Sequence, residues 1–490
     1  MQKKVIIIGA GFSGLAAASF MAKYGWQVTV LEKHNMPGGR ARQFKTEGFT
    51  YDMGPSWYWM PDVFDRYFNL FGKKTSDYYE LVRLDPSYKV HFGDSQITIP
   101  ANYDTLKNVF ENIESGSGVA LDKFITEAKY KYEIGINKLV HKPGLSITEF
   151  IDIDVIKGVV RLDVFTNMKK HVAKYFKDTR LQQLMEFPVL FLGAMANDIP
   201  ALYSLMNYAD IKLGTWYPSG GMYKIVEAMY SVAKGLGVQF QFEQNVKSIN
   251  IDDAKVQSVS TETQILYADA VIASADYNFV EQQLLQPQWR TYKANYWDKK
   301  LMAPSCLLYY VGINKKLKNS IHHHLFFDTD FEQHANEIYT SKAWPKQPLF
   351  YVSNTTATDS TQAPEGCENL FFLIPVAAGL ASDTEEKRNE YFAQIVKRFE
   401  DKIGETITNN IVVNKSYGIT NFVSDYNAYK GNAYGLANTL LQTAILKPTC
   451  KSKKVKNLYF AGQLTVPGPG VPPSLISGEL VAKLVHKQLG

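Results

Sequence analysis

A glycine-rich turn near the N-terminus constrains the fold more than any other feature of this sequence. Residues 9–14 read GAGFSG, directly after the apolar run Lys4–Ile8. Residues 14–24 then have the apolar spacing of a helix, and residues 27–32 are rich in β-formers. A strand, a glycine turn, a helix and a second strand predict a β-α-β unit with the G-x-G-x-x-G pattern of dinucleotide-binding proteins.

The spacing within this unit fits a bound diphosphate. Gly9 permits the tight turn, Gly11 lets a pyrophosphate approach the backbone, and Gly14 lets the helix pack closely on the sheet. The free N–H groups at the helix N-terminus favour an anion. Glu32 follows Gly14 by eighteen residues and could accept hydrogen bonds from both ribose hydroxyls. The alternative is a glycine turn that binds no ligand.

The uncharged stretch over residues 5–22 could also be taken for a membrane span or a signal peptide. Glycine and serine interrupt it at the spacing of a strand, a turn and a helix. No small-residue cleavage site or stop-transfer charge cluster follows it. We therefore interpret this stretch as part of a soluble domain.

Two further segments favour FAD over NAD. Residues 37–42 read PGGRAR, where two glycines allow a second close backbone approach and Arg40 can bind a diphosphate. An ordinary turn is the alternative there. Near the C-terminus, the apolar strand pattern 457–461 precedes Gly462, and a helix is expected from 474 to 488. Its N-terminus could stabilise the negative charge of a reduced flavin.

The remaining pattern predicts a discontinuous α/β protein. With 490 residues the chain is long enough for several domains. Strands are expected within 238–275, 300–313 and 370–375, and helices at 105–114, 181–192 and 383–402. We assign residues 1–70, 220–290 and 445–490 to a nucleotide domain, 71–105 and 291–444 to a substrate domain, and 106–219 to a helical, membrane-associating subdomain.

Several segments together resemble the bacterial-type phytoene desaturases, a family of FAD-dependent carotenoid and retinoid oxidoreductases. They are the glycine turn with Glu32, GGRA at 38–41, FTYDMGPS at 49–56, GTWYPSGGM at 214–222, ADAVIASAD at 268–276 and LYFAGQLTVPGPGVPP at 458–473. The resemblance implies a discontinuous, Rossmann-like FAD domain similar to that of amine oxidases and GDP dissociation inhibitors. An α+β substrate domain would be inserted into it, with a helical, membrane-facing subdomain.

The resemblance also implies which residues bind FAD. They are Gly9, Ala10, Gly11, Phe12, Ser13, Gly14, Glu32, Lys33, Gly39, Arg40, Met53, Gly54, Pro55, Ser56, Val246, Gly462, Gln463, Val471 and Pro472. One departure is visible, because Gly462-Gln463 stands where the family has an acidic or Gly-Ala pair. A side-chain role at Gln463 is therefore in doubt.

The implied function is an FAD-dependent phytoene desaturase that introduces conjugated double bonds stepwise by hydride transfer to flavin, with quinone or oxygen as acceptor. The alternatives are a desaturase of a later carotenoid (a 1-hydroxycarotenoid 3,4-desaturase or a γ-carotene type) and a carotene isomerase. More remote alternatives are a flavin amine oxidase and a non-enzymatic lipid chaperone. A yellow protein that releases FAD on heating would exclude the chaperone.

Aromatic residues are the best candidates for a substrate channel. Trp57, Tyr58, Trp59, Trp216 and Tyr217 could flank a flavin, although core packing explains such residues equally well. No catalytic base can be assigned. The run His322-His323-His324 resembles a metal site, but successive strand residues face opposite sides, so we expect no metal there.

Charge and cysteine content restrict the partners and the compartment. A net charge of +5 is too small to indicate nucleic acid, and three scattered cysteines indicate a reducing compartment, so we expect a cytoplasmic protein. Residues 157–180 hold seven basic and two acidic side chains among apolar ones. Since a long hydrocarbon must come from a bilayer, we hypothesise that this segment docks on anionic lipid as a pair of interfacial helices. A solvated helix face is the alternative.

Overall fold

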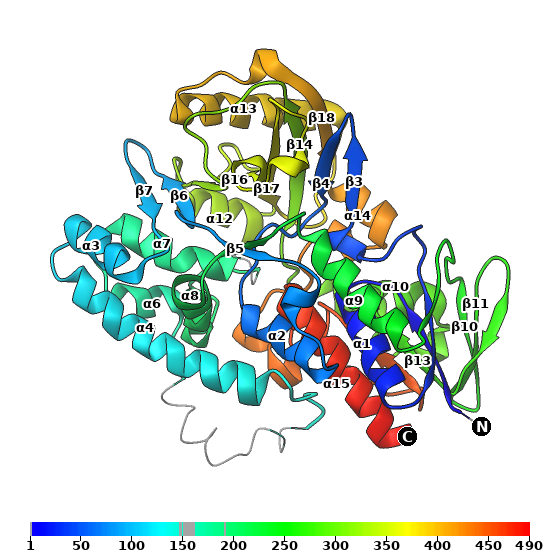
Figure 1. Ribbon diagram of the computed structural model, residues 1–490. Helices are drawn as coiled ribbons and strands as arrows, with labels where there is room; N and C mark the ends of the chain where they lie inside the picture. The colour runs from blue at the N-terminus through cyan, green and yellow to red at the C-terminus, as the bar shows by residue number, and fades with distance from the viewer. Residues whose placement is uncertain (1, 147–148, 150–161, 191–192) are drawn as a thin grey trace.

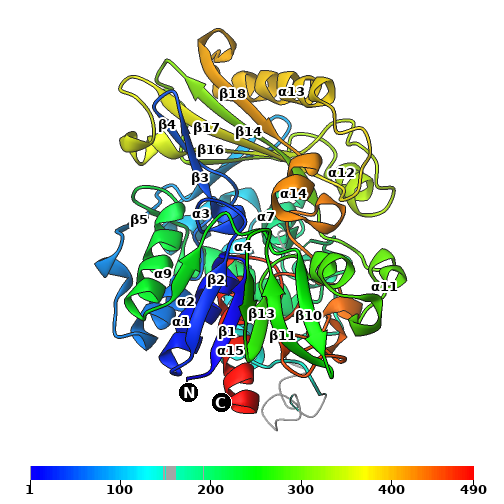
Figure 2. The same ribbon diagram turned by 90° about the vertical axis from the view of Figure 1, so that its right-hand side faces the viewer.

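The N-terminal β-α-β unit lies in the middle of a five-stranded parallel sheet. The computed structural model describes residues 2–146, 149, 162–190 and 193–490. Strand β1 (Lys4–Ile8) pairs with β2 (Gln27–Leu31) and β13 (Ala270–Ala273), and the outer strands are β9 (Gln239–Gln241) and β19 (Leu458–Phe460). The N-terminal, middle and C-terminal segments thus share one sheet, which confirms the predicted discontinuous α/β fold (Figure 2).

Alternate residues of β1 enter two different cores. Val5 and Ile7 pack with helices α1 (Phe12–Lys23), α9 (Tyr223–Gly235) and α15 (Val471–Leu489). Ile6 and Ile8 pack against the antiparallel sheet of β10 (Ser248–Asp252), β11 (Lys255–Ser260) and β12 (Ile265–Tyr267). The two-residue period of a strand therefore covers the parallel sheet on both faces.

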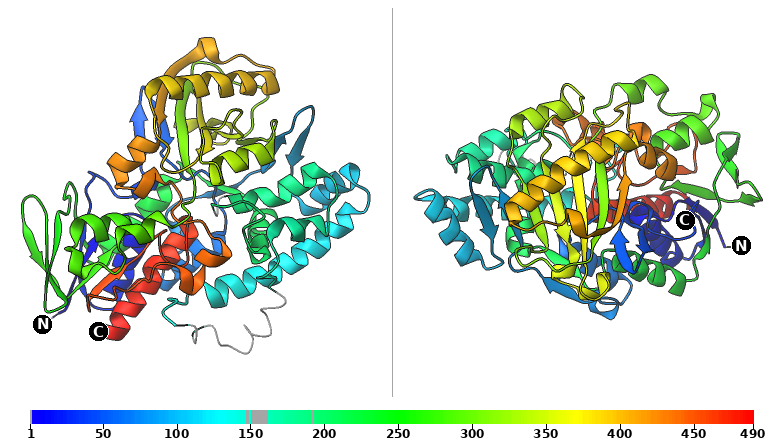
Figure 3. Two further views of the ribbon diagram at one scale, coloured as in Figure 1. Left: turned by 180° about the vertical axis from the view of Figure 1, so that it is seen from behind. Right: turned by 90° about the horizontal axis from the view of Figure 1, so that it is seen from above.

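A seven-stranded mixed sheet forms the upper part of the molecule in Figure 1. Its order is β18 (Ile411–Tyr417), β14 (Ser305–Ile313), β17 (Glu368–Val376), β16 (Phe350–Asn354), β15 (His323–Phe326), β6 (Tyr88–His91) and β7 (Gln96–Ile99). Helix α13 (Glu385–Ile403) covers one face with Ile395 and Phe399. The opposite face looks toward the nucleotide part, and α12 (Phe331–Tyr339) lies beside it (Figure 3).

Helices dominate the side of the molecule away from the parallel sheet (Figures 1 and 3). They are α3 (Tyr103–Ile113), α4 (Ser117–Ile134), α6 (Met168–Ala173), α7 (Thr179–Leu190) and α8 (Leu205–Tyr208). Within the described residues, none of the helices combines the length and apolar character that crossing a bilayer requires. The residue boundaries predicted for the three parts of the chain stay a prediction.

The smaller elements connect these parts. They are α2 (Pro61–Leu70), α10 (Tyr277–Phe279), α11 (Ala294–Asp298), α14 (Ile419–Tyr426), and the paired strands β3 (Gln43–Thr46) with β4 (Phe49–Asp52) and β5 (Leu81–Arg83) with β8 (Trp216–Pro218).

Two sequence expectations need correction. Helix α15 begins at Val471 and not at residue 474, because prolines are tolerated in a first turn whose N–H groups have no partner within the helix. The apolar side chains of the basic segment do not all face outward in its described part, where Phe165 is 83% exposed, and docking on lipid stays a prediction. Leu162, Met168 and Val172 are buried in the protein, and residues 157–161 lie outside the described residues.

Candidate active site

A cavity of about 470 Å³ opens at the carboxyl ends of the parallel strands. Residues that end β1, β2, β13 and β19, or directly follow them, line it: Ile8, Gly9, Leu31, Glu32, Ser274, Ala461 and Gly462. This edge is where open α/β sheets bind their ligands. The cavity continues from there toward the seven-stranded sheet, so we describe it as a cofactor arm and an apolar arm.

Glu32 holds a carboxylate against the glycine turn. Its side chain is 5% exposed, accepts a hydrogen bond from the backbone N–H of Ala10 at 2.8 Å and another from that of His34 at 3.0 Å. The two bonds hold the carboxylate at the cavity wall, where its remaining lone pairs can accept ribose hydroxyls. The Gln244-Asn245-Val246 segment lines the cavity beside it.

Two long helices point their N-termini at the cavity. Neither α1, after Gly11, nor α15, after Gly470, has a side-chain cap. The first N–H groups of α1 are therefore available to a ligand, whereas α15 offers only that of Val471, because Pro472 and Pro473 have none. A Cβ on Gly478 would lie 2.2 Å from the Ser13 carbonyl oxygen, so the helices meet at a contact only glycine permits. Both chain ends therefore build one anion-binding wall, which suits a diphosphate and a reduced flavin.

Arg40 occupies the junction of the two arms. Its guanidinium is buried, donates to the Asn432 carbonyl at 3.2 Å and lies 5.2 Å from the ring centroid of Tyr426. The Gln463 carboxamide, with its oxygen toward the guanidinium, accepts from both Nη atoms at 3.1 and 3.3 Å. Arg40 Nε has no protein partner among the described residues, and the cofactor arm lies beside it. The free Arg40 Nε–H can donate to an oxygen-rich cofactor. The contact with Arg40 also gives the Gln463 side chain a role, which was in doubt from the sequence.

The other predicted cofactor residues are placed as follows. Gly9, Gly11, Phe12, Ser13, Lys33, Gly39, Met53, Gly54, Pro55, Ser56, Val246, Gly462, Val471 and Pro472 line the cavity. Ala10 and Gly14 lie behind that lining, Ala10 as the donor to Glu32 and Gly14 as a packing contact. Lys33 Nζ donates to the Ser424 carbonyl at 2.8 Å. The glycine turn, Glu32, residues 37–42 around Arg40 and the loop that begins at Gly462 therefore converge on one wall that fits FAD.

The apolar arm is built from side chains that are far apart in sequence. They are Trp57, Trp59, Phe187, Leu190, Met206, Cys306, Leu308, Leu325, Phe327, Phe331, His334, Ala335, Ile338, Tyr339, Leu349, Phe350, Tyr351, Leu373 and Tyr434. Trp57 stacks on His323 with ring centroids 4.2 Å apart and lies 5.2 Å from Trp59. Sequence reasoning found only the two tryptophans, because no contiguous motif unites the rest.

Three of the aromatic residues predicted for the channel lie elsewhere. Tyr58 is buried on the opposite side of its segment from Trp57 and Trp59, and its hydroxyl bonds to that of Tyr79. Trp216 and Tyr217 belong to β8, which pairs with β5. Tyr217 contacts a small separate cavity beside Asp52, while the Trp216 indole lies over Arg83. Strand pairing therefore removes Trp216 and Tyr217 from the apolar arm, and burial against Tyr79 removes Tyr58.

The ionisable side chains of the apolar arm are held neutral. Burial lowers the pKa of His334 to about 4, and its two ring nitrogens already bind the Leu349 N–H and the Pro375 carbonyl. Burial also raises the pKa of the Cys306 thiol above its usual range. Among the described lining residues of this arm, none carries a carboxylate. Its chemistry therefore suits an uncharged substrate.

The histidine run is part of the protein core. His324 Nδ1 lies 3.0 Å from His91 Nε2, His323 Nδ1 lies 2.6 Å from the Tyr351 hydroxyl, and His322 Nδ1 lies 2.7 Å from Thr358 Oγ1. The three rings thus have three separate partners. Burial lowers the pKa of each ring, which keeps the run uncharged at neutral pH.

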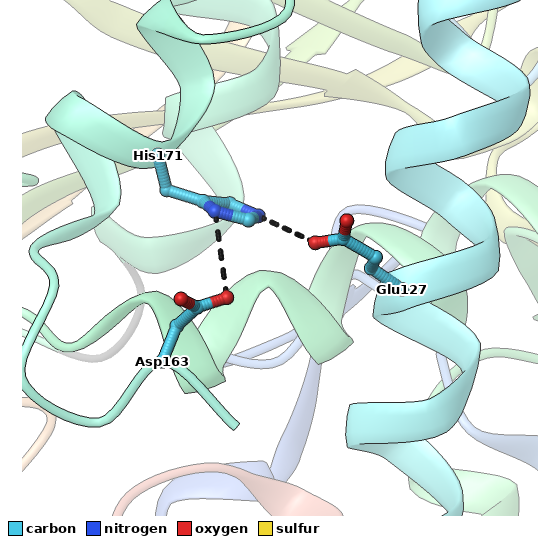
Figure 4. A group of neighbouring side chains, drawn as sticks. All are labelled: Glu127, Asp163 and His171. Carbon is cyan, nitrogen blue, oxygen red and sulfur yellow. Dashed lines mark ion pairs between the residues drawn. The ribbon is translucent and has the colours of Figure 1, made fainter. Parts of the chain in front are cut away.

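A second group of metal-ligating side chains lies in the helical part (Figure 4). His171 lies between Asp163 and Glu127, with Nδ1 3.7 Å from the first carboxylate and Nε2 4.0 Å from the second. The buried ammonium of Lys131 lies 2.9 Å from Asp163 and 3.3 Å from His171 Nε2. A positive charge is therefore already present in this group, which explains it as an ion-pair network that joins α4 to the segment before α6.

Comparison with known proteins agrees with this geometry. Residues 12–486 match the family model described as flavin containing amine oxidoreductase. A carotenoid 3,4-desaturase of Haloarcula japonica is 39% identical over 489 residues, covering 99% of this chain and 98% of that protein. A zeta-carotene-forming phytoene desaturase of Myxococcus xanthus is 30% identical and covers 98% and 93%.

Solved structures with similar folds are more distant in sequence. Cyclohexylamine oxidase from Brevibacterium oxydans superposes with a TM-score of 0.59 at 15% identity, covering 100% of both chains. An oxidoreductase from Methanosarcina mazei gives a TM-score of 0.62 at 16% identity, covering 98% of this chain and 100% of that one. At these identities the likeness concerns the fold alone.

Proposed function

The chain belongs to the flavin-containing amine oxidoreductases, and we propose that within this family it desaturates a carotenoid. It is an FAD-dependent oxidoreductase whose curated relatives are carotenoid desaturases. The observation that carries the proposal is the continuity of the two arms. A wall suited to FAD faces, in the same cavity, a long arm of aromatic and aliphatic side chains without a carboxylate.

The residues of the apolar arm bind and orient the substrate. Bound FAD supplies a two-electron oxidant for a carbon–carbon bond, which loses two hydrogen atoms in total. Trp57, Trp59 and Phe327 surround the polyene, exclude water and present aromatic faces to any positive charge that develops along it. Among the described residues that line it, the arm has no cationic or anionic anchor, which favours a carotenoid over the charged amines that an amine oxidase would bind.

Phytoene is the first candidate substrate, with conjugated double bonds introduced stepwise to a lycopene-type product. A later carotenoid is the second candidate, and it is favoured by the 39% identity to a protein named carotenoid 3,4-desaturase. Quinone or oxygen would accept the electrons.

Expression in two hosts tests the substrate. One host accumulates phytoene and the other a later, hydroxylated carotenoid, and both receive the wild-type chain or its Glu32→Ala variant. Pigment chromatography should show new, longer chromophores in one host with the wild type only. Unchanged pigments in both hosts, from a yellow purified protein, would contradict carotenoid desaturation.

We propose that the substrate enters from a membrane surface, through a patch different from the segment predicted by sequence. This patch, the leucine patch, comprises Leu145, Leu440, Leu441, Ile445 and Leu446, all exposed, with Leu441 at 77%. Gly144 packs against the backbone of Ala444, which brings the two segments together. The Thr443 hydroxyl lies 3.1 Å from the Tyr203 hydroxyl. Tyr203 lies in the turn that directly precedes α8, which holds the cavity residue Met206, so the patch lies near the cavity wall.

Charge around the leucine patch indicates the lipid that it would meet. Residues 437–457 contain five lysines and no acidic residue. Of these lysines, Lys447 is buried and Lys456 lies 3.9 Å from the Asp253 carboxylate. An apolar surface in a lysine-rich segment is typical of proteins that rest on anionic bilayers. The peripheral, cytoplasmic location predicted from the sequence fits such a surface.

Vesicle flotation tests this surface. A Leu441→Glu/Leu446→Glu double variant should lose binding to vesicles that contain anionic lipid, while keeping its FAD. The matched control is Ile265→Glu/Tyr267→Glu, because those side chains are 60% and 72% exposed on β12. Equal flotation of both variants would contradict the proposal.

A further inference from the structure

Two tyrosines in the apolar arm have hydroxyl groups that the protein does not use. Tyr339 and Tyr434 both line the cavity. Among the described residues, neither hydroxyl has a hydrogen-bond partner. The neighbouring Tyr351, by contrast, bonds through its hydroxyl to His323 at 2.6 Å. Both residues are half-buried, so two hydroxyls that line a cavity without a protein partner can bind a ligand there.

The two phenols are donors at every physiological pH. Burial raises the pKa of both Tyr339 and Tyr434 well above the ordinary value for tyrosine. The pKa of Tyr434 is raised further by Tyr339, Tyr351 and Cys306, which places these groups in one neighbourhood. A protonated phenol offers one O–H to an acceptor. The complementary ligand atom is therefore an oxygen with a free lone pair.

The backbone around both residues fixes their positions. Tyr339 is the last residue of α12, and Phe331, Ala335 and Ile338 of the same helix line the arm. Tyr434 lies between two anchored neighbours, since the Ala433 N–H donates to Pro304 and the Gly435 N–H donates to Asn432 Oδ1. The pair therefore forms part of the arm's rigid wall.

Tyr434 lies at the cofactor end of the arm. Its neighbour Asn432 accepts from Arg40 through its carbonyl oxygen and lies 3.0 Å from the Gln463 amide through Oδ1. Gln463 and Arg40 belong to the wall of the cofactor arm. A group bound by Tyr434 would consequently lie toward the cofactor end of the apolar arm.

We propose that Tyr339 and Tyr434 form a binding site for an oxygen atom on the substrate in the apolar arm. The substrate class is then a carotenoid with a hydroxyl or carbonyl group near one end, in preference to a pure hydrocarbon. This inference rests on the proposed carotenoid desaturase function and selects the later carotenoid among its candidate substrates. Sites that hydrogen-bond a substrate hydroxyl discriminate strongly against analogues that lack it, because their own polar groups are then left unpaired.

Substrate competition tests the oxygen site. Wild type, Tyr434→Phe, Tyr339→Phe and the double variant receive a linear carotene and its terminally hydroxylated counterpart in the same vesicles. Each single variant should lower kcat/KM for the hydroxylated substrate about tenfold, and the double variant about a hundredfold. The kcat/KM for the hydrocarbon should stay within about twofold, because phenylalanine retains the apolar surface.

Tyr351→Phe is the matched control, since Tyr351 lines the same arm but its hydroxyl already bonds to His323. It should change the rates on both substrates alike. A loss shared equally by both substrates, or no loss with either, in the Tyr339 and Tyr434 variants would overturn the oxygen site.

A binding measurement separates this inference from the proposed function. The two carotenoids are offered as an equal mixture, and the pigment that stays with the protein after gel filtration is analysed. Retention of mainly hydroxylated pigment by the wild type, but not by the double variant, supports the site even if no pigment is oxidised. Equal retention of both pigments by wild type overturns it, even if both are desaturated.

Discussion

The two arms of the cavity are built in different ways. The cofactor arm consists of backbone N–H groups, glycines and the fixed carboxylate of Glu32, drawn from short contiguous motifs. The apolar arm consists of side chains from α7, β15, α12, β16 and the loop around Tyr434. A charged cofactor is thus recognised by local backbone geometry, whereas an uncharged substrate is recognised by a surface that exists only after long-range packing.

This difference predicts which changes affect which ligand. Variants of the cofactor arm should lose bound flavin. Variants of the apolar arm should keep flavin and lower only the kcat/KM for the substrate.

Gly14→Ala should have the largest effect. A Cβ on Gly14 would lie 2.0 Å from the Gly9 carbonyl oxygen, so α1 and the glycine turn must separate. We expect loss of bound FAD and a marked fall in Tm, measured on the purified protein. Gly235→Ala at the end of α9 is the control, because nothing lies within 4 Å of its added Cβ. Yellow Gly14→Ala protein of normal Tm would contradict the account.

Glu32→Ala should weaken FAD binding about a hundredfold. It removes the ribose acceptor and leaves the Ala10 and His34 N–H groups without their partner, at about 1–3 kcal/mol for each buried donor. FAD dissociation can be followed by flavin fluorescence. The exposed Glu47, changed to alanine, should retain FAD as the wild type does. Equal retention by both variants would remove the ribose role of Glu32.

Phe327→Ala should lower the kcat/KM for the substrate about tenfold and leave FAD binding intact, because Phe327 lines the apolar arm. Its neighbour Phe326 faces the core on the other side of the sheet. Phe326→Ala should therefore lower the free energy of unfolding by about 3–5 kcal/mol and leave KM unchanged. The two measurements are steady-state kinetics and chemical denaturation. A KM change in the Phe326 variant alone would reverse the assignment of the two faces.

The smallest effect concerns pH. Because His334 has a pKa of about 4, the apolar arm stays neutral as pH falls from about 8 to about 5, and KM for the carotenoid should change less than about twofold. A His334 with an ordinary pKa would charge in this interval and weaken binding as pH falls. KM measured in vesicles across this range distinguishes the two cases.

The same pKa carries a stability prediction of definite sign. An unfolded histidine takes up a proton near pH 6.5 and the folded His334 only near pH 4, so protons favour the unfolded chain between these values. The stability advantage of wild type over His334→Gln should be complete above pH 6.5 and fall toward pH 4. A difference that is independent of pH would contradict the neutral, buried imidazole.

The cofactor arm could be predicted from the sequence because its residues belong to short contiguous motifs. The glycine turn, Glu32, residues 37–42 around Arg40 and the loop that begins at Gly462 can each be recognised without knowledge of the tertiary structure. The parallel sheet followed from the same motifs, since apolar strand runs flank them.

The apolar arm could not be predicted in this way. Aromatic residues such as Trp57 and Tyr217 look alike in sequence, and only the pairing of β8 with β5 assigns Tyr217 elsewhere. The apolar residues of the basic segment were ambiguous for the same reason. Met168 and Val172 have the spacing of a lipid-facing helix, but the partner that buries them is the protein's own core.

Anaerobic mixing of the purified yellow protein with a carotenoid in vesicles tests the central claim most directly. If one cavity holds FAD against the substrate, the visible flavin absorbance should bleach as the carotenoid gains a double bond, one flavin for each bond. A flavin that stays oxidised with both the hydrocarbon and the hydroxylated carotenoid, while dithionite still bleaches it, would contradict the account.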